Sequence, residues 1–596
     1  MTTPTTRSLV DQERPRAAGS SARTATLRHA SAAARLLRRL EPPLGRPTRV
    51  AEARFSGAGL TVGGVFVAAS LLPSLLPRLA AVQGVISGVS LVVGYGIGTA
   101  AAATFAYLGV PRPRGRFHAV LVSGSVALCV LVLVLAAWKQ VGWQNDIRHL
   151  YGMPPIGPGG WPLVAAVTVL VSAVLLIVSR SIRVGFRAVR RRLGRRMPRR
   201  LATVVGAAAL LVASWALFSG VLVTGFFAGA NALFAPSDTV VPAGAEPPTS
   251  PVRSGGPGSA VAWTDLGAEG RGFVSGGPDV QDINDATGGG ARLPVRVYVG
   301  LRSADTAEAR ADLVLSELQR TGAFDRKVLV LATTTGTGYL DRNGTDPLEF
   351  LWNGDTAIAG VQYSYLPSWI SLLADQEAAS ETSRTVFAAV HRYWSTLPES
   401  SRPRLYLYGL SLGSYGVESI LGSIDLINEP IDGALLVGPP FVNPVHAGLV
   451  ADRDPGSPAS LPAHGDGRTV RFMSERDGPD PAAGRWGPTR IVYLQHASDP
   501  VVFFDSDLAF APPEWLSDGQ RGPDVSPRMG WFPLVSMVQV LLDLPSAGSV
   551  PMGYGHLYSG PANERAWVAI TDPPGWDDAA LQRLATTLAG RPHPYG

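Results

Sequence analysis

The sequence contains little cysteine and histidine, and these shortages exclude several kinds of chemistry. Cys129 is the single cysteine and lies in an apolar run, which excludes an intrachain disulfide, a cysteine metal cluster and a cysteine redox pair. The nine histidines are scattered, and neither H-E-x-x-H nor a similar ligand spacing occurs. We therefore expect neither a metal nor another cofactor.

Charged residues are also scarce. They make up 16% of the 596 residues, whereas hydrophobic residues make up 46%, and the mean hydropathy is +0.16. This composition is unusual for a water-soluble protein and predicts membrane segments. A chain of this length also exceeds what one hydrophobic core usually holds, so we expect at least two unlike regions.

Acidic residues are nearly missing from the first third of the chain. Residues 1–201 hold 27 of the 52 basic residues but only 5 of the 46 acidic ones. The basic residues flank apolar runs, where they determine membrane topology, and they do not line one folded face. We therefore expect a membrane as a partner and no nucleic acid.

Five apolar runs are long enough to predict transmembrane helices of about 20 residues. They lie at 55–77, 80–110, 119–142, 161–179 and 202–227. Arg-rich loops at 111–118 and 180–200 alternate with loops near 78–80 and at 144–160, which carry one Arg each. Because positively charged loops stay in the cytoplasm, the N-terminus is predicted to be cytoplasmic and everything after residue 227 extracytoplasmic.

The chain is predicted to have four parts. They are a basic disordered cytoplasmic tail at 1–54, a transmembrane helical domain at 55–230, a Pro/Gly/Ser linker at 231–260 and a folded domain at 261–596. In the last part, apolar strands alternate with helix-like stretches. The strands are expected at 294–301, 327–334, 404–409, 433–438 and 490–496, and the helices at 305–320, 378–395, 412–422 and 576–589. This alternation predicts a doubly wound, mainly parallel α/β sheet.

Ser411 lies in the sequence Gly409-Leu410-Ser411-Leu412-Gly413, between a predicted strand and a predicted helix. A G-x-S-x-G sequence in this context is typical of a nucleophile elbow, in which the glycines allow a sharp turn that exposes the serine hydroxyl. The same pentapeptide outside a strand-turn-helix unit would indicate only an ordinary turn.

A serine nucleophile needs a base, and the base needs an acid that fixes its tautomer. Asp499 follows the predicted strand at 490–496, and His556 lies in a Gly-rich loop before the last helix, so the chain order is Ser, Asp, His. The alternative histidines are His496 and His593, and the alternative carboxylates are Asp505 and Asp507.

Two backbone N–H groups are expected to bind the oxyanion. One belongs to Leu412, directly after the nucleophile. The other is expected in the loop ATTTGTG at 332–338, from Thr335 or Thr334. The aromatic residues Tyr363, Tyr365, Trp369 and Phe441 and the segment 441–488 are candidates for an acyl pocket and its lid, with core packing as the alternative for the aromatics.

Several blocks of the sequence resemble one family. YGLSLGSYG, VQYSYLPSWISLL, VGPPF, LQHASDPVVFF, RGPDVSPRMGWFP and GYGHLYSG resemble the catalytic region of a membrane-anchored α/β-hydrolase family of actinobacteria, and SLLPSLLPR resembles its N-terminal membrane domain. The resemblance implies an α/β-hydrolase fold and a serine hydrolase in the cell membrane. Leu410 departs from the acidic residue expected at that place in many members.

The sequence therefore predicts a membrane-anchored serine hydrolase that cleaves lipid or envelope acyl esters through an acyl-enzyme on Ser411. Two alternatives remain open. One is an acyltransferase that uses the same Ser411, Asp499 and His556. The other is a catalytically silent transport or scaffold protein, against which the complete Ser-Asp-His order argues.

Overall fold

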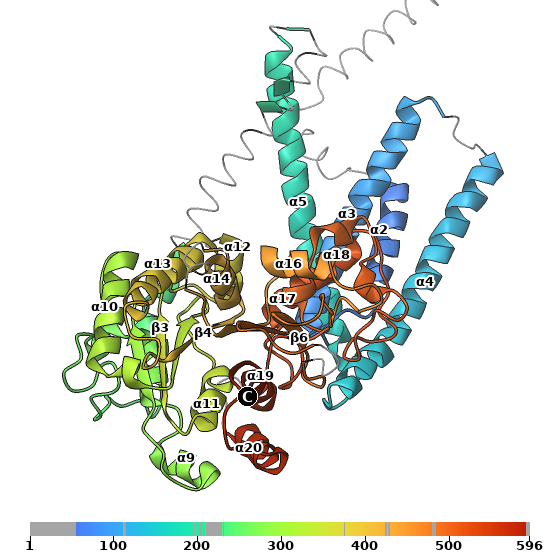
Figure 1. The fold of residues 1–596 in the computed structure, drawn as a ribbon. Helices are drawn as coiled ribbons and strands as arrows, with labels where there is room; N and C mark the ends of the chain where they lie inside the picture. The colour runs from blue at the N-terminus through green and yellow to red at the C-terminus, as the bar shows by residue number, and fades with distance from the viewer. Residues whose placement is uncertain are drawn as a thin grey trace, which may run out of the picture. The chain divides into compact units, whose positions relative to one another are not determined.

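The computed structural model describes residues 55–110, 115–195, 232–374, 376–423, 429–479 and 484–591, together with isolated positions between 197 and 230 and at 426. The predicted tail, most of the predicted span at 202–227, and His593 lie outside the described residues. We name residues 55–195 the helical region and residues 232–591 the sheet region (Figure 1).

The sheet region is built on seven strands that all run parallel, in the order β1-β3-β2-β4-β5-β7-β6. The strands are β1 (Val295–Val299), β2 (Val328–Thr333), β3 (Thr356–Val361), β4 (Arg404–Leu410), β5 (Gly433–Val437), β6 (Val470–Met473) and β7 (Arg490–Leu494). Every residue of β1, β3 and β5 is buried, as expected for strands covered on both faces. This confirms the predicted doubly wound parallel sheet.

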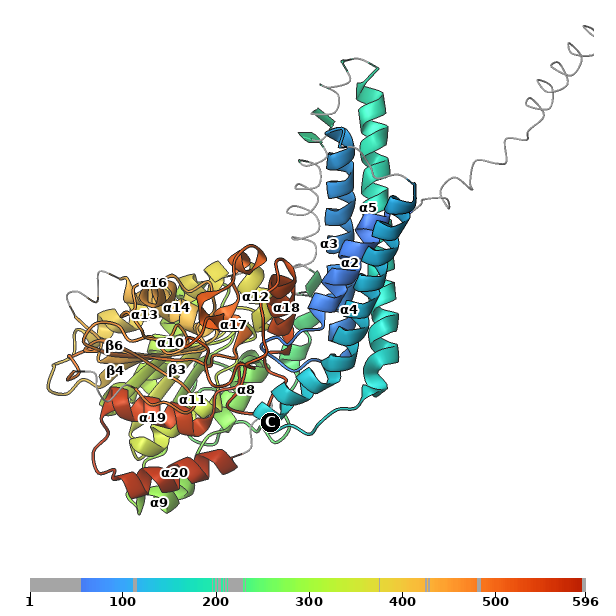
Figure 2. The same ribbon diagram turned by 90° about the vertical axis from the view of Figure 1, so that its right-hand side faces the viewer.

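Helices cover both faces of the sheet (Figures 1 and 2). One face carries α10 (Ala307–Arg320), α13 (Gln376–Trp394) and α14 (Leu412–Leu421); the other carries α11 (Arg342–Leu351) and α19 (Gly560–Thr571), with α9 (Val280–Thr287) and α20 (Asp578–Gly590) outside them. The remaining α-helices of the described sheet region are α8 (Gly267–Ser275), α12 (Ser368–Ala374), α16 (Pro444–Ala451), α17 (Pro500–Phe503) and α18 (Val535–Asp543). The predicted helices at 305–320, 378–395, 412–422 and 576–589 correspond to α10, α13, α14 and α20.

The segment expected as a linker packs against β1 at the edge of the sheet. The backbone N–H of Ser254 donates to the carbonyl of Arg296 at 3.0 Å, and the N–H of Arg296 donates to the carbonyl of Val252 at 3.3 Å. Ser254 is fully buried. An edge strand presents unpaired backbone groups, and this segment satisfies several of them. Residues 252–254 are therefore held against the edge of the sheet.

The helical region contains α2 (Gly57–Ser70), α3 (Ala80–Tyr107), α4 (Gly115–Leu150) and α5 (Trp161–Leu193). Small residues let α3 approach α5 closely. A Cβ added to Gly84 would lie 2.6 Å from Cβ of Val167, and one added to Gly88 would lie 2.8 Å from Cβ of Val171. Close approach at small residues is the usual packing of helices in a membrane.

Among the described residues, three helical stretches are long and apolar enough to cross a membrane: Ala80–Tyr107, Ala119–Leu150 and Pro158–Leu193. The first predicted span differs from the structure, because α2 has only 14 residues and ends at Ser70. Pro73 and Pro77 follow and lack the N–H that a continuing helix needs. Large apolar side chains are exposed along α4 and α5, including Leu128, Leu131 and Leu170.

Candidate active site

Ser411 stands between β4 and α14 in a backbone conformation that is rare for a residue with a side chain. Its φ is 54° and its ψ is −129°. A Cβ added to Gly409 would lie 2.4 Å from the carbonyl carbon of Gly413, and one added to Gly413 would lie 2.3 Å from the carbonyl oxygen of Thr333. Both glycines of the G-x-S-x-G pattern are therefore required because neighbouring backbone atoms leave no room for a side chain. The turn costs roughly 1–3 kcal/mol of strain at Ser411.

Asp499 follows β7 and caps the N-terminus of α17. Its side chain is fully buried. Oδ1 accepts a hydrogen bond from the backbone N–H of Val501 at 2.8 Å. Oδ2 lies 2.6 Å from Nδ1 of His556 and accepts a hydrogen bond from the hydroxyl of Tyr558 at 2.7 Å. The carboxylate is therefore held on both oxygens, and one of them orients the imidazole.

His556 lies in the loop that precedes α19, and its backbone N–H donates to the carbonyl of Ala547 at 2.9 Å. The other ring nitrogen, Nε2, is buried and has no hydrogen-bond partner within the described part of the chain. A carboxylate beside Nδ1 favours the tautomer with the proton on that nitrogen. Nε2 is then left as a free base.

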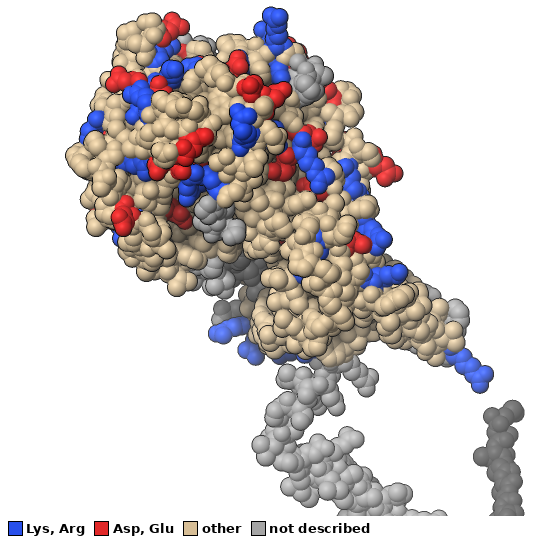
Figure 3. Space-filling model, turned by 90° about the horizontal axis from the view of Figure 1, so that it is seen from below, with Lys and Arg blue, Asp and Glu red and all other residues tan. Residues whose placement is uncertain are grey.

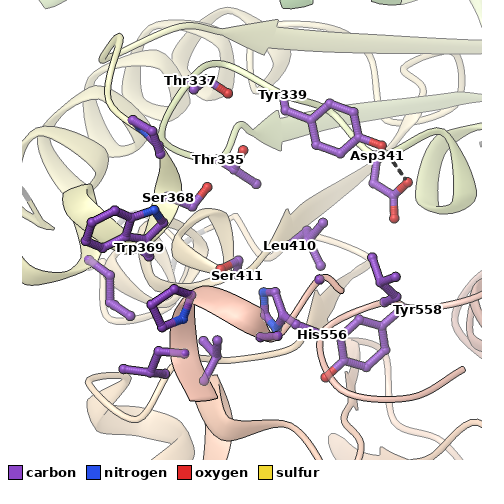
Figure 4. A pocket seen from close by; sticks show the side chains of 18 residues that line it. Thr335, Thr337, Tyr339, Asp341, Ser368, Trp369, Leu410, Ser411, His556 and Tyr558 are labelled. Atoms are coloured by element: carbon purple, nitrogen blue, oxygen red, sulfur yellow. Dashed lines mark hydrogen bonds between the residues drawn. The ribbon is translucent and has the colours of Figure 1, made fainter. Parts of the chain in front are cut away.

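Ser411 and His556 line one cavity of about 330 Å³ (Figure 4). The lining includes apolar residues (Trp369, Leu372, Val501, Leu544 and Leu557) and polar ones (Thr335, Thr337, Tyr339, Asp341 and Ser368). The Thr337 hydroxyl donates at 3.4 Å to Glu269, whose pKa is raised to about 7 by burial.

The two backbone N–H groups that were expected to bind the oxyanion differ in whether they already have a hydrogen-bond partner. Leu412 is the first residue of α14, where backbone N–H groups have no partner within the helix. The backbone N–H of Thr335 donates to the carbonyl of Tyr339 at 3.0 Å, so it is occupied in this structure. The side chain of Thr335 lines the cavity, and its hydroxyl is the second donor that this residue can offer.

The alternative acids and base lie elsewhere. Asp505 accepts a hydrogen bond from the N–H of Asp507 in an exposed turn. His496 contacts two acceptors, the carbonyl of Gly555 at 2.9 Å and Glu475 at 3.3 Å. Burial lowers the pKa of His496, but the adjacent Glu475 carboxylate raises it by more, so the net pKa is raised. None of these three residues lines the cavity.

The sequence patterns did not identify several residues of the site. Tyr558 and the segment from Leu544 to Gly548 are among them, although Tyr558 lies only two residues after His556. Of the aromatic candidates, Trp369 lines the cavity, whereas Tyr363 and Phe441 pack with the apolar core. No residue of segment 441–488 lines the cavity, so a lid from this segment is not observed among the described residues.

The described residues contain no group of three or more His, Cys, Asp or Glu side chains that could hold a metal ion. The fold, with a strained serine after a central parallel strand, is that of an α/β hydrolase. A model described as the alpha/beta-hydrolase family matches residues 295–584, and one described as the N-terminus of the same family matches residues 71–278. These matches support assignment of the chain to an α/β-hydrolase family with a hydrolase-like activity. Neither a curated protein nor a solved structure matched the chain.

Proposed function

We propose that the protein is a membrane-anchored serine hydrolase that cleaves carboxylic esters of lipids or envelope acyl groups. One observation carries the proposal. Ser411, with its left-handed φ of 54°, and His556, hydrogen-bonded to buried Asp499, line the same cavity. Nucleophile, base and orienting acid are the three parts that acyl transfer through a serine requires.

In the proposed reaction, Oγ of Ser411 attacks the ester carbonyl carbon while Nε2 of His556 takes the hydroxyl proton. The same nitrogen gives this proton to the leaving alcohol, and an acyl-enzyme remains. Nε2 then takes a proton from water while the water oxygen attacks the acyl carbon. It gives this proton to Oγ of Ser411 as the acid leaves, which restores the serine hydroxyl and the neutral imidazole. Nε2 has no hydrogen-bond partner among the residues that the structure describes, which supports this role.

The developing oxyanion is assigned to the backbone N–H of Leu412 and the hydroxyl of Thr335. The acyl chain is assigned to the apolar lining residues, among them Trp369 and Leu372, and the alcohol part to the polar lining residues. A cavity of about 330 Å³ lies at the lower end of the usual range for ligand pockets.

The membrane anchor is supported by the exposed apolar side chains of α4 and α5, which water would disfavour. The sheet region contacts the helices beside the two Arg-poor segments. Arg78, in the loop after α2, contacts Asp543, and Asp146, near the C-terminal end of α4, contacts Arg528. The end of α3 at Tyr107 and the end of α5 at Leu193, where Arg190, Arg191 and Arg192 form the last turn, lie at the opposite end of these helices (Figure 1). This arrangement supports a catalytic region outside the cytoplasm.

A nucleic-acid partner finds no support on the face drawn in Figure 3, where acidic and basic side chains are interspersed. A continuous basic surface would be expected for binding phosphates.

The proposed activity is tested by labelling the detergent-purified full chain with a fluorophosphonate. We expect rapid labelling of the wild type and none of Ser411→Ala, because only an activated hydroxyl reacts quickly. Ser419→Ala is the matched control, since Ser419 lies on α14, the helix that follows Ser411, but does not line the cavity. Equal labelling of Ser411→Ala would disprove the nucleophile.

Product analysis separates hydrolysis from transfer. With a long-chain p-nitrophenyl ester and an added acceptor alcohol, we expect free acid to accumulate. Acyl-acceptor without free acid would show an acyltransferase.

A further inference from the structure

The sequence SLLPSLLPR at 70–78, which we name the SLLP segment, leaves α2 and enters the sheet region. Leu75 and Leu76 are fully buried in one apolar cluster with Leu544, Ala547 and Val550. Ser74 is also fully buried. A segment expected to end a membrane span is therefore part of the core behind the cavity.

A buried ion pair joins this segment to the end of α18. Nε of Arg78 donates to Oδ1 of Asp543 at 3.2 Å, and the hydroxyl of Ser74 donates to Oδ2 at 2.5 Å. The Arg78 and Asp543 side chains are each 1% exposed. Gln539, one turn earlier on α18, donates to the carbonyls of Ser70 and Leu72. The C-terminal end of α18 is thus held by polar contacts from the helical region.

Asp543 is directly followed by the cavity wall. Leu544, Pro545, Ala547 and Gly548 line the cavity, and the carbonyl of Ala547 accepts the backbone N–H of His556. Asp543, a member of the ion pair, therefore lies four residues before Ala547, whose carbonyl holds the backbone of His556.

The other side of the His556 loop also rests on the helical region. The ring of Tyr554 stacks on that of Tyr151, with centroids 4.3 Å apart, and its hydroxyl donates to the carbonyl of Leu150 at 3.0 Å. The hydroxyl of Tyr151 donates in turn to the carbonyl of Leu75 at 2.7 Å. Residues on both sides of the loop thus contact the N-terminal part of the chain.

We propose that Arg78 is a positioning residue for His556. Through Asp543 it holds the cavity-lining segment 544–548 in place, and this segment positions His556 relative to Ser411. The helical region is then part of the active-site scaffold as well as an anchor. The proposal rests on His556 acting as the base in the proposed function.

A purely stabilising role is the competing explanation, and the physics of buried ions separates the two. Removing one member of a buried ion pair leaves an uncompensated charge, whereas replacing both members by apolar residues of similar volume is often neutral for stability. Arg78→Met/Asp543→Leu should therefore keep the fold while losing the directional contact that orients residue 544 and its neighbours.

The experiment measures two quantities on the detergent-purified full chain: the number of fluorophosphonate-labelled sites per molecule and the labelling rate constant. We expect Arg78→Met/Asp543→Leu to label nearly every molecule, with a rate constant at least ten-fold below that of the wild type. Arg78→Lys, which keeps the charge, should lie between the two. Glu317→Gln changes a buried carboxylate at the far edge of the sheet, so it should lower the unfolding temperature and leave the rate constant unchanged.

Fewer labelled sites at an unchanged rate constant in the double variant would show a stabilising role only and overturn the inference. A wild-type rate constant with full labelling would overturn it as well. Arg78→Met alone is not needed for the decision, so its failure to fold would not affect the test. An unlabelled wild type would instead disprove the proposed function, and the inference with it.

Discussion

Asp499→Asn tests how the imidazole of His556 is oriented, and the structure gives the expected result in detail. Oδ2 faces two donors, Nδ1 of His556 and the hydroxyl of Tyr558, and Oδ1 faces the backbone N–H of Val501. If the amide oxygen of Asn faces His556, its NH₂ group meets the N–H of Val501 at about the observed 2.8 Å. One buried donor then loses its acceptor, at a cost of about 1–3 kcal/mol.

The opposite amide orientation avoids placing two donors against each other. The oxygen accepts from Val501, and the NH₂ donates to Nδ1 of His556, while the hydroxyl of Tyr558 rotates to accept. The imidazole then carries its proton on Nε2, which can no longer take the proton of Ser411. We therefore expect a folded enzyme whose turnover falls by roughly 10⁴-fold, the size of this effect in a serine-protease triad.

The assay is p-nitrophenyl ester hydrolysis, with thermal unfolding measured on the same samples. Tyr558→Phe is the control, because it keeps the carboxylate and the ring stacked on His496 but removes one hydrogen bond. A hydrogen bond to a charged group contributes about 1.5–3 kcal/mol, so this variant should lose stability and keep turnover within ten-fold of the wild type. Turnover of Asp499→Asn within ten-fold of the wild type would refute the tautomer argument.

Three further outcomes are expected. Burial lowers the pKa of His446 to about 4, so the contribution of the neutral imidazole to stability is present above pH 6.5 and is lost as pH falls toward 4. Over that range the free energy of unfolding of the wild type should fall by about 3 kcal/mol relative to that of His446→Gln, as measured by thermal unfolding. Gly413→Ala places a methyl group 2.3 Å from the carbonyl oxygen of Thr333 and should abolish fluorophosphonate labelling, whereas Gly422→Ala, with nothing within 4 Å, should not. Trp369→Ala should lower kcat/KM about ten-fold or more for long-chain esters and leave that for acetate esters unchanged, because an acetyl group is too short to contact this apolar side chain. Equal losses for both esters would contradict the assignment of Trp369 to the acyl site.

Local patterns were enough to predict much of the sheet region. The strands β1, β2, β4, β5 and β7 are apolar runs that were predicted within a few residues. The strands β3 and β6 were not predicted. β3 reads TAIAGV, in which small residues weaken the apolar signal, and β6 has only four residues at the sheet edge. Their places in the sheet depend on pairing with distant strands, which no local pattern contains.

The candidate site divides in the same way. Ser411, Asp499 and His556 were proposed because each lies in a short pattern at the end of an element, and the structure brings the two side chains of Asp499 and His556 to 2.6 Å. Thr335 was proposed as a backbone donor, but the turn to Tyr339 uses that N–H, and a hydrogen bond within a loop is not visible in composition. The contact of Arg78 with Asp543 joins residues 465 positions apart, so nothing near either residue indicated it.

The position of Arg78 also bears on the predicted membrane topology. In the sequence it counts as the single positive charge of the loop near 78–80, on the side predicted to be extracytoplasmic. The positive-inside rule counts Lys and Arg, and acidic residues contribute little to it. The pairing of Arg78 with Asp543 in the folded chain therefore does not remove Arg78 from the count. The contrast between this single Arg and the Arg-rich loop at 180–200 favours the predicted orientation. A phosphatase reporter that is active only after export should be active when fused after residue 250, and a reporter that is active only in the cytoplasm should be inactive at that position. The reverse result would place the catalytic region inside the cell.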